Sequence, residues 1–65
     1  MCEANAYWIE DGREQLIMEA VDEVTPEGEN AWQLVGIFGD RKHIKGRISG
    51  MSLVDHKVFF EAMPD

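Results

Sequence analysis

A clear alternation of residue types occurs in RKHIKGRIS at positions 41–49. Two isoleucines, Ile44 and Ile48, fall on one face of an extended chain, and the basic side chains fall on the other. Such a period of two predicts a strand with one buried side. Gly46 lies on the apolar face between the isoleucines, where the missing side chain lets a neighbouring backbone or a large ring approach closely.

Alternating residues continue on both sides of this stretch. They predict further strands over residues 2–8, 14–18, 20–25, 31–35, 51–54 and 57–62. Residues typical of turns separate several of these segments, namely Asp11-Gly12, Pro26-Glu27-Gly28, Gly36 with Gly39, and Asp55-His56. Glycine, proline, asparagine and aspartate favour the backbone conformations of tight turns. The chain is therefore expected to run as a series of hairpins.

The alternation is least regular between residues 14 and 25. Leu16 and Met18 share one face there, but Ile17 makes the other face apolar as well. Val21 and Val24 stand three residues apart, so either a β-bulge or a short helical turn lies in residues 20–25. Both are β-branched, and we therefore expect a strand that contains a β-bulge.

The fold class that follows is all-β, as a single domain over residues 1–65. Six or seven short strands with tight turns are typical of a small antiparallel barrel or rolled sheet of the SH3-like or Sm-like type. Ile17, Val54 and Phe59 fall on the faces opposite the expected core. Together they would form an exposed apolar patch suited to a dimer interface.

Length and composition limit the possible protein classes. A chain of 65 residues holds one small core with about 3–5 kcal/mol of net stability, unless a metal or a partner subunit adds to it. Cys2 is the only cysteine, so no disulfide can form within the chain. No apolar run is long enough for a membrane span, and no basic segment precedes an apolar one at the N-terminus. We expect a cytoplasmic protein.

The charge is acidic overall but unevenly distributed. The net charge is −7, with ten acids and one base in residues 1–40 and three acids and five bases in residues 41–65. Binding to nucleic acid is unlikely for such a chain, because a phosphate backbone attracts basic surfaces. The alternative is an RNA-binding or regulatory adaptor that uses the basic face of the Arg41–Ser49 strand, with Arg41, Lys45 and Arg47 as its contacts.

The sequence contains no catalytic constellation, and we do not expect an enzyme. His43 lies on the polar face of the basic strand and His56 in a turn, where solvated side chains are the usual finding. Glu3 and Asn5 lie on the strand face opposite Cys2, so they could share a metal with its thiol only through a second chain.

Cys2 is the residue whose position carries chemical information. If Met1 is removed, the α-amine and the thiolate of Cys2 can close one chelate ring. If Met1 is retained, its amine, the main-chain nitrogen of Cys2 and the thiolate can close two fused rings. Nitrogen and sulfur donors in one plane suit Ni(II) or Cu(II) better than the tetrahedral geometry that Zn(II) requires.

The order of these features resembles the CooT family, small nickel-binding proteins associated with the maturation of carbon monoxide dehydrogenase and also filed as predicted RNA-binding proteins. The resemblance rests on Met-Cys-Glu-Ala-Asn at 1–5, Asp11-Gly12, Leu-Ile-Met-Glu at 16–19, Pro26-Glu27-Gly28, Phe-Gly-Asp at 38–40, Gly46-Arg47-Ile48 and Leu-Val-Asp-His-Lys at 53–57. It implies a cytoplasmic homodimer that binds one Ni(II) per dimer through Cys2, with a nickel enzyme as its client. Hydrogenase-maturation chaperones of the HypC type also begin Met-Cys, but they continue with Ala, Ile and Pro after an apolar residue.

Overall fold

The computed structural model describes residues 3–62 of the chain. Within that range there are six strands and no helix: β1 (Ala4–Glu10), β2 (Arg13–Pro26), β3 (Ala31–Gly36), β4 (Arg41–Lys45), β5 (Arg47–Ser52) and β6 (Lys57–Glu61). None of these residues belongs to a helix that could cross a membrane. The prediction of an all-β domain is confirmed.

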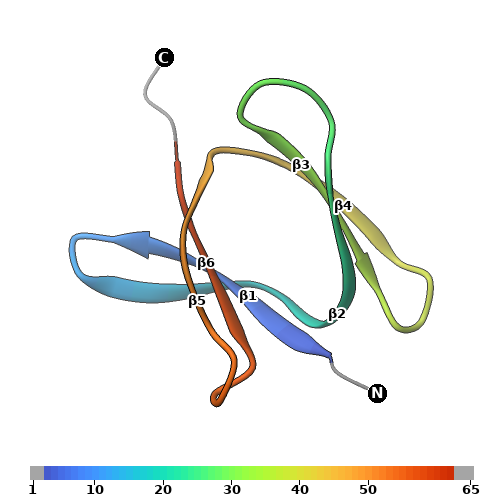
Figure 1. Ribbon diagram of the computed structural model, residues 1–65, viewed down its shortest axis with the longest axis horizontal. Coiled ribbons are helices and arrows are strands. Elements are labelled where there is room, and N and C mark those ends of the chain that lie inside the picture. The colour runs from blue at the N-terminus through green and yellow to red at the C-terminus, as the bar shows by residue number, and fades with distance from the viewer. Residues whose placement is uncertain (1–2, 63–65) are drawn as a thin grey trace.

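The strands form one mixed sheet in the order β4-β3-β2-β1-β6-β5 (Figure 1). Neighbouring strands are antiparallel except β1 and β6, which run parallel. β4 and β5 follow one another in the chain, yet they form opposite edges of the sheet. The sheet is therefore rolled without being closed into a barrel. The expected rolled sheet is confirmed, and the parallel pair of β1 and β6 departs from the antiparallel pairing that was expected with it.

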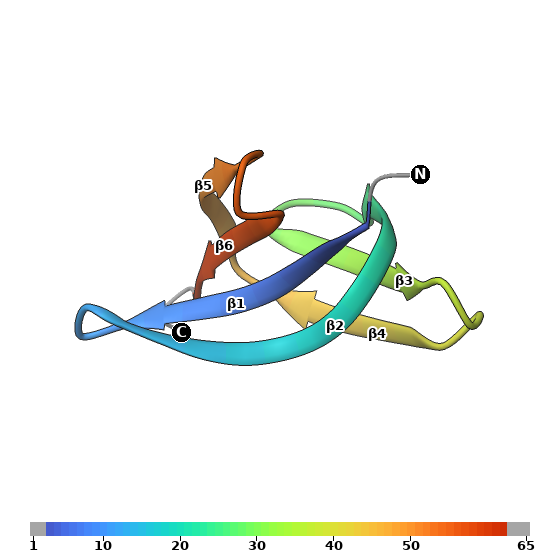
Figure 2. The ribbon, with the colours of Figure 1, turned by 90° about the horizontal axis from the view of Figure 1, so that it is seen from below.

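β2 provides much of the curvature and sweeps through the molecule in one long arc (Figure 2). Its pairing with β1 shifts register twice, and its pairing with β3 shifts once. Ala6 pairs with Met18 while Tyr7 pairs with Leu16, which leaves Ile17 without a residue opposite it. Ala20, in the second irregular region, has a left-handed backbone with φ of 53°. Bulges of this kind bend a strand and increase its twist.

The bulges decide which of the apolar side chains enter the core. Ile17 and Met18 are both buried, at 9% and 8% exposure, whereas Leu16 is 47% exposed. The bulge between Val21 and Val24 that the sequence indicated is present. The expectation that Leu16 shares the core face with Met18 is wrong, because the bulge at Ile17 inverts the alternation.

Gly46 interrupts the stretch that was expected to be one continuous strand. It stands between β4 and β5 and redirects the chain from one edge of the sheet to the other. A Cβ atom at this position would lie 2.5 Å from the carbonyl oxygen of Glu61 and 3.1 Å from Cζ3 of Trp8. The close approach of a backbone and a ring at Gly46 is therefore confirmed.

The core lies on the inner side of the rolled sheet. Its buried residues are Ala6, Ile17, Met18, Val21, Leu34, Ile44, Val58 and Phe60. Phe60 is fully buried and meets two tryptophans, with ring centroids 6.4 Å from Trp8 and 6.2 Å from Trp32. This aromatic cluster joins β1, β3 and β6.

The exposed patch that the alternation predicted from Ile17, Val54 and Phe59 does not form. Ile17 belongs to the core. Val54 is 89% exposed but lies in the turn between β5 and β6 rather than in a strand. Phe59 is half-buried, and its ring packs beside Tyr7 with the centroids 6.2 Å apart.

Candidate functional site

Cys2 and Met1, the predicted metal ligands, lie outside the described residues. The structure gives the surroundings of the next residue, Glu3, and of Ala4, where β1 begins. Any group held by Cys2 would therefore lie near this end of β1. The geometry of that end is the basis for assessing the predicted site.

A hollow of about 420 Å³ lies beside the start of β1, lined by Glu3, Asn5, Asp55 and His56. It forms because the turn before β6 lies beside the first residues of β1. The main-chain nitrogen of Asn5 donates a hydrogen bond of 2.8 Å to the carbonyl oxygen of His56. His56 has a left-handed backbone with φ of 55°, which fits its place in a tight turn. The sequence placed His56 in this turn but did not indicate that the turn lies beside Glu3.

An adjoining groove of about 340 Å³ is lined by apolar residues, by three acids and by Lys57 and His56. The apolar residues are Ala4, Val21, Val24, Met51, Leu53 and Val58, and the acids are Glu3, Asp22 and Glu23. Leu53 is 78% exposed and Met51 57%. The three carboxylates attract cations to this end of the molecule, while the exposed apolar side chains favour contact with another surface.

Another feature of the described residues is the spacing of their ligand-type side chains, on which metal binding depends. Residues 3–62 contain no cluster of three histidine, cysteine, aspartate or glutamate side chains with the spacing to hold an ion. Glu3, Asp55 and His56 are the ligand-type side chains that line the hollow beside the start of β1.

The remaining candidate ligands have other contacts. His43 lies on β4, where its Nδ1 is 2.6 Å from Oε1 of Glu27. The side-chain oxygen of Asn5 accepts a hydrogen bond of 3.0 Å from the backbone N–H of Ala20. Asn5 thus satisfies the bulge in β2, a structural role that the sequence analysis missed.

The basic face of residues 41–49 is divided between two strands. Arg41 and Lys45 lie on β4, whereas Arg47 lies beyond the Gly46 corner on β5. Nη2 of Arg47 is 2.9 Å from Oε1 of Glu61, and its Nε donates to the same oxygen at 3.0 Å. A carboxylate therefore offsets part of the charge that the RNA-binding alternative requires.

One ionisable group near the groove has a shifted pKa. Lys57 donates a hydrogen bond of 3.0 Å from its Nζ to Oε1 of Glu14, and this contact raises the pKa of the lysine above its ordinary value. The ammonium also lies 5.2 Å from the centre of the Tyr7 ring. Lys57 therefore remains protonated at neutral pH and reduces the negative charge of the region.

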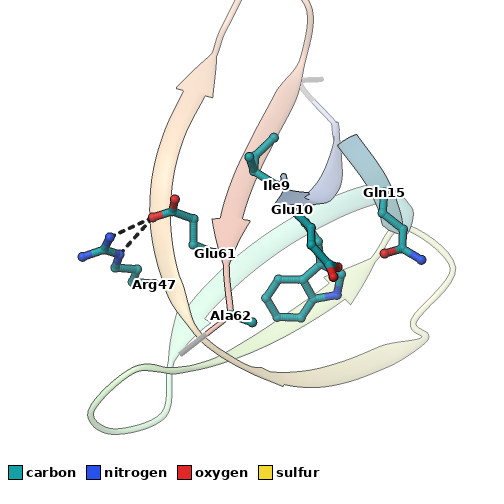
Figure 3. Close-up of a pocket in the computed structure, with 7 residues that line it drawn as sticks. Ile9, Glu10, Gln15, Arg47, Glu61 and Ala62 are labelled. Atoms are coloured by element: carbon teal, nitrogen blue, oxygen red, sulfur yellow. Dashed lines mark hydrogen bonds and ion pairs between the residues drawn. The ribbon is translucent and has the colours of Figure 1, made fainter. Parts of the chain in front are cut away.

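A larger cleft lies at the opposite end of β1 (Figure 3). It has a volume of about 800 Å³ and is lined by Trp8, Ile9, Glu10, Gln15, Arg47, Glu61 and Ala62. These residues come from β1, β2, β5 and β6 and the residue that follows β6. The sequence gives no sign of this cleft, because its lining comes from distant segments and carries no recognisable motif.

Two comparisons with known proteins point to the same family. The sequence model for "CO dehydrogenase accessory protein CooT" matches residues 1–61. A crystal structure assigned to CooT from Carboxydothermus hydrogenoformans has 40% sequence identity and a TM-score of 0.88, and the match covers 97% of this chain and 100% of that one. No curated protein matches the chain.

Proposed function

This chain belongs to the CooT family of CO dehydrogenase accessory proteins, and we propose that it binds Ni(II) through Cys2 as a homodimer and supplies the metal to a nickel enzyme. The observation that carries the proposal is the family match over residues 1–61, which includes the cysteine at position 2. The proposed role is that of a carrier, with the nickel ion as cargo and CO dehydrogenase as the client.

The donor atoms available at residues 1 and 2 suit nickel. A cysteine thiolate joined to main-chain nitrogen gives the sulfur and nitrogen ligands that square-planar Ni(II) accepts. The proposed ligands are the thiolate and main-chain nitrogen of Cys2, together with the amine of Met1 where that residue is retained. Each of these nitrogens must lose or lack a proton to bind the metal, so binding should release protons.

The need for four donors supports a dimer. One Cys2 with its nitrogens provides at most three donors, whereas a square-planar ion takes four. Two chains related by a twofold axis would bring two thiolates and two nitrogens to one ion. The exposed Leu53 and Met51 line the groove beside Glu3, so a second chain at this end would also cover apolar surface.

Calorimetric titration with Ni(II) tests the site directly. The Cys2→Ser variant should lose tight binding, while His43→Ala should bind as the unmodified protein does, because His43 lies against Glu27. Equal nickel affinity in the Cys2→Ser variant and the unmodified protein would overturn the proposal. Loss of binding in His43→Ala would place the site on β4 instead.

Stoichiometry and mass test the assembly. We expect a dimer by sedimentation equilibrium in the presence of a chelator, and one nickel ion for every two chains after loading. A monomer at micromolar concentration would contradict the first expectation. One tightly held ion per chain would contradict the second, because each subunit would then bind nickel alone.

A further inference from the structure

The cleft at the far end of β1 is separate from the proposed nickel site. Cys2 precedes β1, whereas Trp8, Ile9 and Glu10 are the last three residues of that seven-residue strand. At the rise of an extended chain, the two ends are about 20 Å apart. Nickel binding does not account for the shape or the lining of this cleft.

Trp8 provides the cleft with an aromatic surface held in place by the core. The side chain is half-buried, and its ring lies edge-on to Phe60 at an interplanar angle of 69°. The absent side chain of Gly46 allows the ring to approach the corner between β4 and β5. The carbonyl oxygen of Gly46 accepts the indole N–H of Trp32, which fixes the corner further. A rigid ring of this kind loses little entropy when a ligand binds.

The charged residues of the cleft leave a carboxylate free to meet a cation. In Figure 3, Arg47 and Glu61 point toward one another on one side, and Glu10 and Gln15 lie on the other. Arg47 directs two nitrogens at one oxygen of Glu61, so these two charges largely neutralise each other. Glu10 makes no ion pair within the part of the chain that the structure describes, and this includes Arg13, its register partner.

We propose that this cleft binds an arginine or lysine side chain on a segment of a partner protein. The cation would lie against the indole of Trp8 and pair with the carboxylate of Glu10, while its aliphatic stem would contact Ile9 and Ala62. Tryptophan is the best aromatic partner for a cation, and long basic side chains bury their stems on apolar surface.

Charge decides among the possible occupants. The net charge of −7 attracts a basic partner from a distance. An acidic ligand would have to compete with Glu61 for Arg47 and would meet Glu10. The basic segment is therefore the occupant that matches both the cleft and the whole surface.

The two tryptophans allow a test with an internal control. The indole N–H of each gives one signal in a proton–nitrogen correlation spectrum, and Trp32 is outside the cleft with its N–H bonded to Gly46. Titration with the peptide acetyl-Leu-Arg-Leu-amide should move the Trp8 signal and leave that of Trp32 in place. The same peptide with citrulline in place of arginine keeps the shape of the side chain but lacks its charge. Its affinity should be lower by about twofold or more.

Matched variants identify the carboxylate. Glu10→Gln should weaken the arginine peptide about two- to fivefold, the range expected for one exposed cation contact. Asp22→Asn removes the same charge from the groove at the other end of β1 and should have less effect. Cys2→Ser should bind the peptide normally, which separates this site from nickel binding.

Three results would overturn the proposal. They are equal binding of the arginine and citrulline peptides, equal losses from Glu10→Gln and Asp22→Asn, and a shift of the Trp8 signal by the acidic peptide acetyl-Leu-Glu-Leu-amide alone. The first result would show that the cleft binds only the apolar side chains of the peptide. The second would show that binding depends on the overall negative charge and not on Glu10. The third would show that the cleft binds an anion through Arg47.

Discussion

Strands β2 and β3 pair with each other, yet they are built differently. β2 shifts register against both of its neighbours, whereas β3 pairs with β4 through five consecutive residues without interruption. In β3, Leu34 is fully buried while its neighbours Gln33 and Val35 are partly exposed. β2 buries two consecutive residues, Ile17 and Met18. The curvature of this sheet is therefore concentrated in particular residues of one strand.

The irregular positions of β2 are supported by side chains from other strands. Asn5 on β1 accepts the N–H of Ala20, and Lys42 on β4 donates from its Nζ to the carbonyl oxygen of Ile17 at 3.2 Å. A bulge leaves backbone groups without their usual ladder partners, and such groups are costly when unsatisfied. These contacts indicate that the bulges of β2 are stabilised by particular side chains of the neighbouring strands.

The largest expected effect comes from replacing adjacent residues of the bulge. Ile17→Ala should lower the free energy of unfolding by about 2–5 kcal/mol, because it removes a buried branched side chain. Leu16→Ala should cost less than about 1 kcal/mol, since Leu16 is largely exposed. Urea unfolding of both variants measures the difference. A regular strand would give the reverse order, and that result would show that the bulge is absent in solution.

The second effect concerns the corner where β4 ends. Gly46→Ala should destabilise the protein by about 1–3 kcal/mol, because the new Cβ would meet the carbonyl oxygen of Glu61 and the Trp8 ring. Gly50→Ala is the matched control, since its Cβ would lie 3.8 Å from Phe59, an ordinary contact. Thermal unfolding compares the two. Similar stability in both variants would mean that the corner is looser than the structure indicates.

A smaller effect is expected from the side chain that satisfies the bulge. Asn5→Ala should cost about 1 kcal/mol, because the partly buried N–H of Ala20 loses its acceptor. Asn5→Asp keeps an acceptor oxygen and should retain most of that stability. Amide hydrogen exchange at Ala20 provides the local measurement, with faster exchange expected only in the alanine variant. Equal exchange in both variants would remove the proposed role of Asn5.

The same contrast explains which features the sequence could predict. Alternation located β3 and the buried face of β6 correctly, because nothing interrupts the period of two there. Alternation placed Ile17 on the outer face of the sheet, whereas its side chain is in the core. Residues 16–18 are all apolar, so hydrophobicity cannot identify the bulged residue. Gly46 was recognised as a point of close approach, but the change of direction there depends on contacts with distant strands.

Prediction of the candidate sites was limited in the same way. The proposed ligand Cys2 was found from its position in the chain, which needs no knowledge of the fold. The place of His56 beside Glu3 and the cleft around Trp8 depend on how β6 returns to β1. A parallel pair between distant segments leaves no local signal in the sequence.

The smallest expected effect is a pH dependence on the outer side of the bent region. Lys57 on β6 reaches across β1 to Glu14 on β2, and its pKa is raised from 10.5 chiefly by this hydrogen bond. The folded protein therefore holds the proton more tightly than the unfolded chain, so the contribution is complete below 10.5 and is lost as the pH rises through the higher, folded-state value. Urea midpoints measured from about pH 9 to about pH 11.5 should fall more steeply for the unmodified protein than for Lys57→Met. Glu14→Gln should flatten the curve in the same way, because it removes the other half of the contact. Parallel curves for all three proteins would show that the pair adds nothing to the stability of the bent strand.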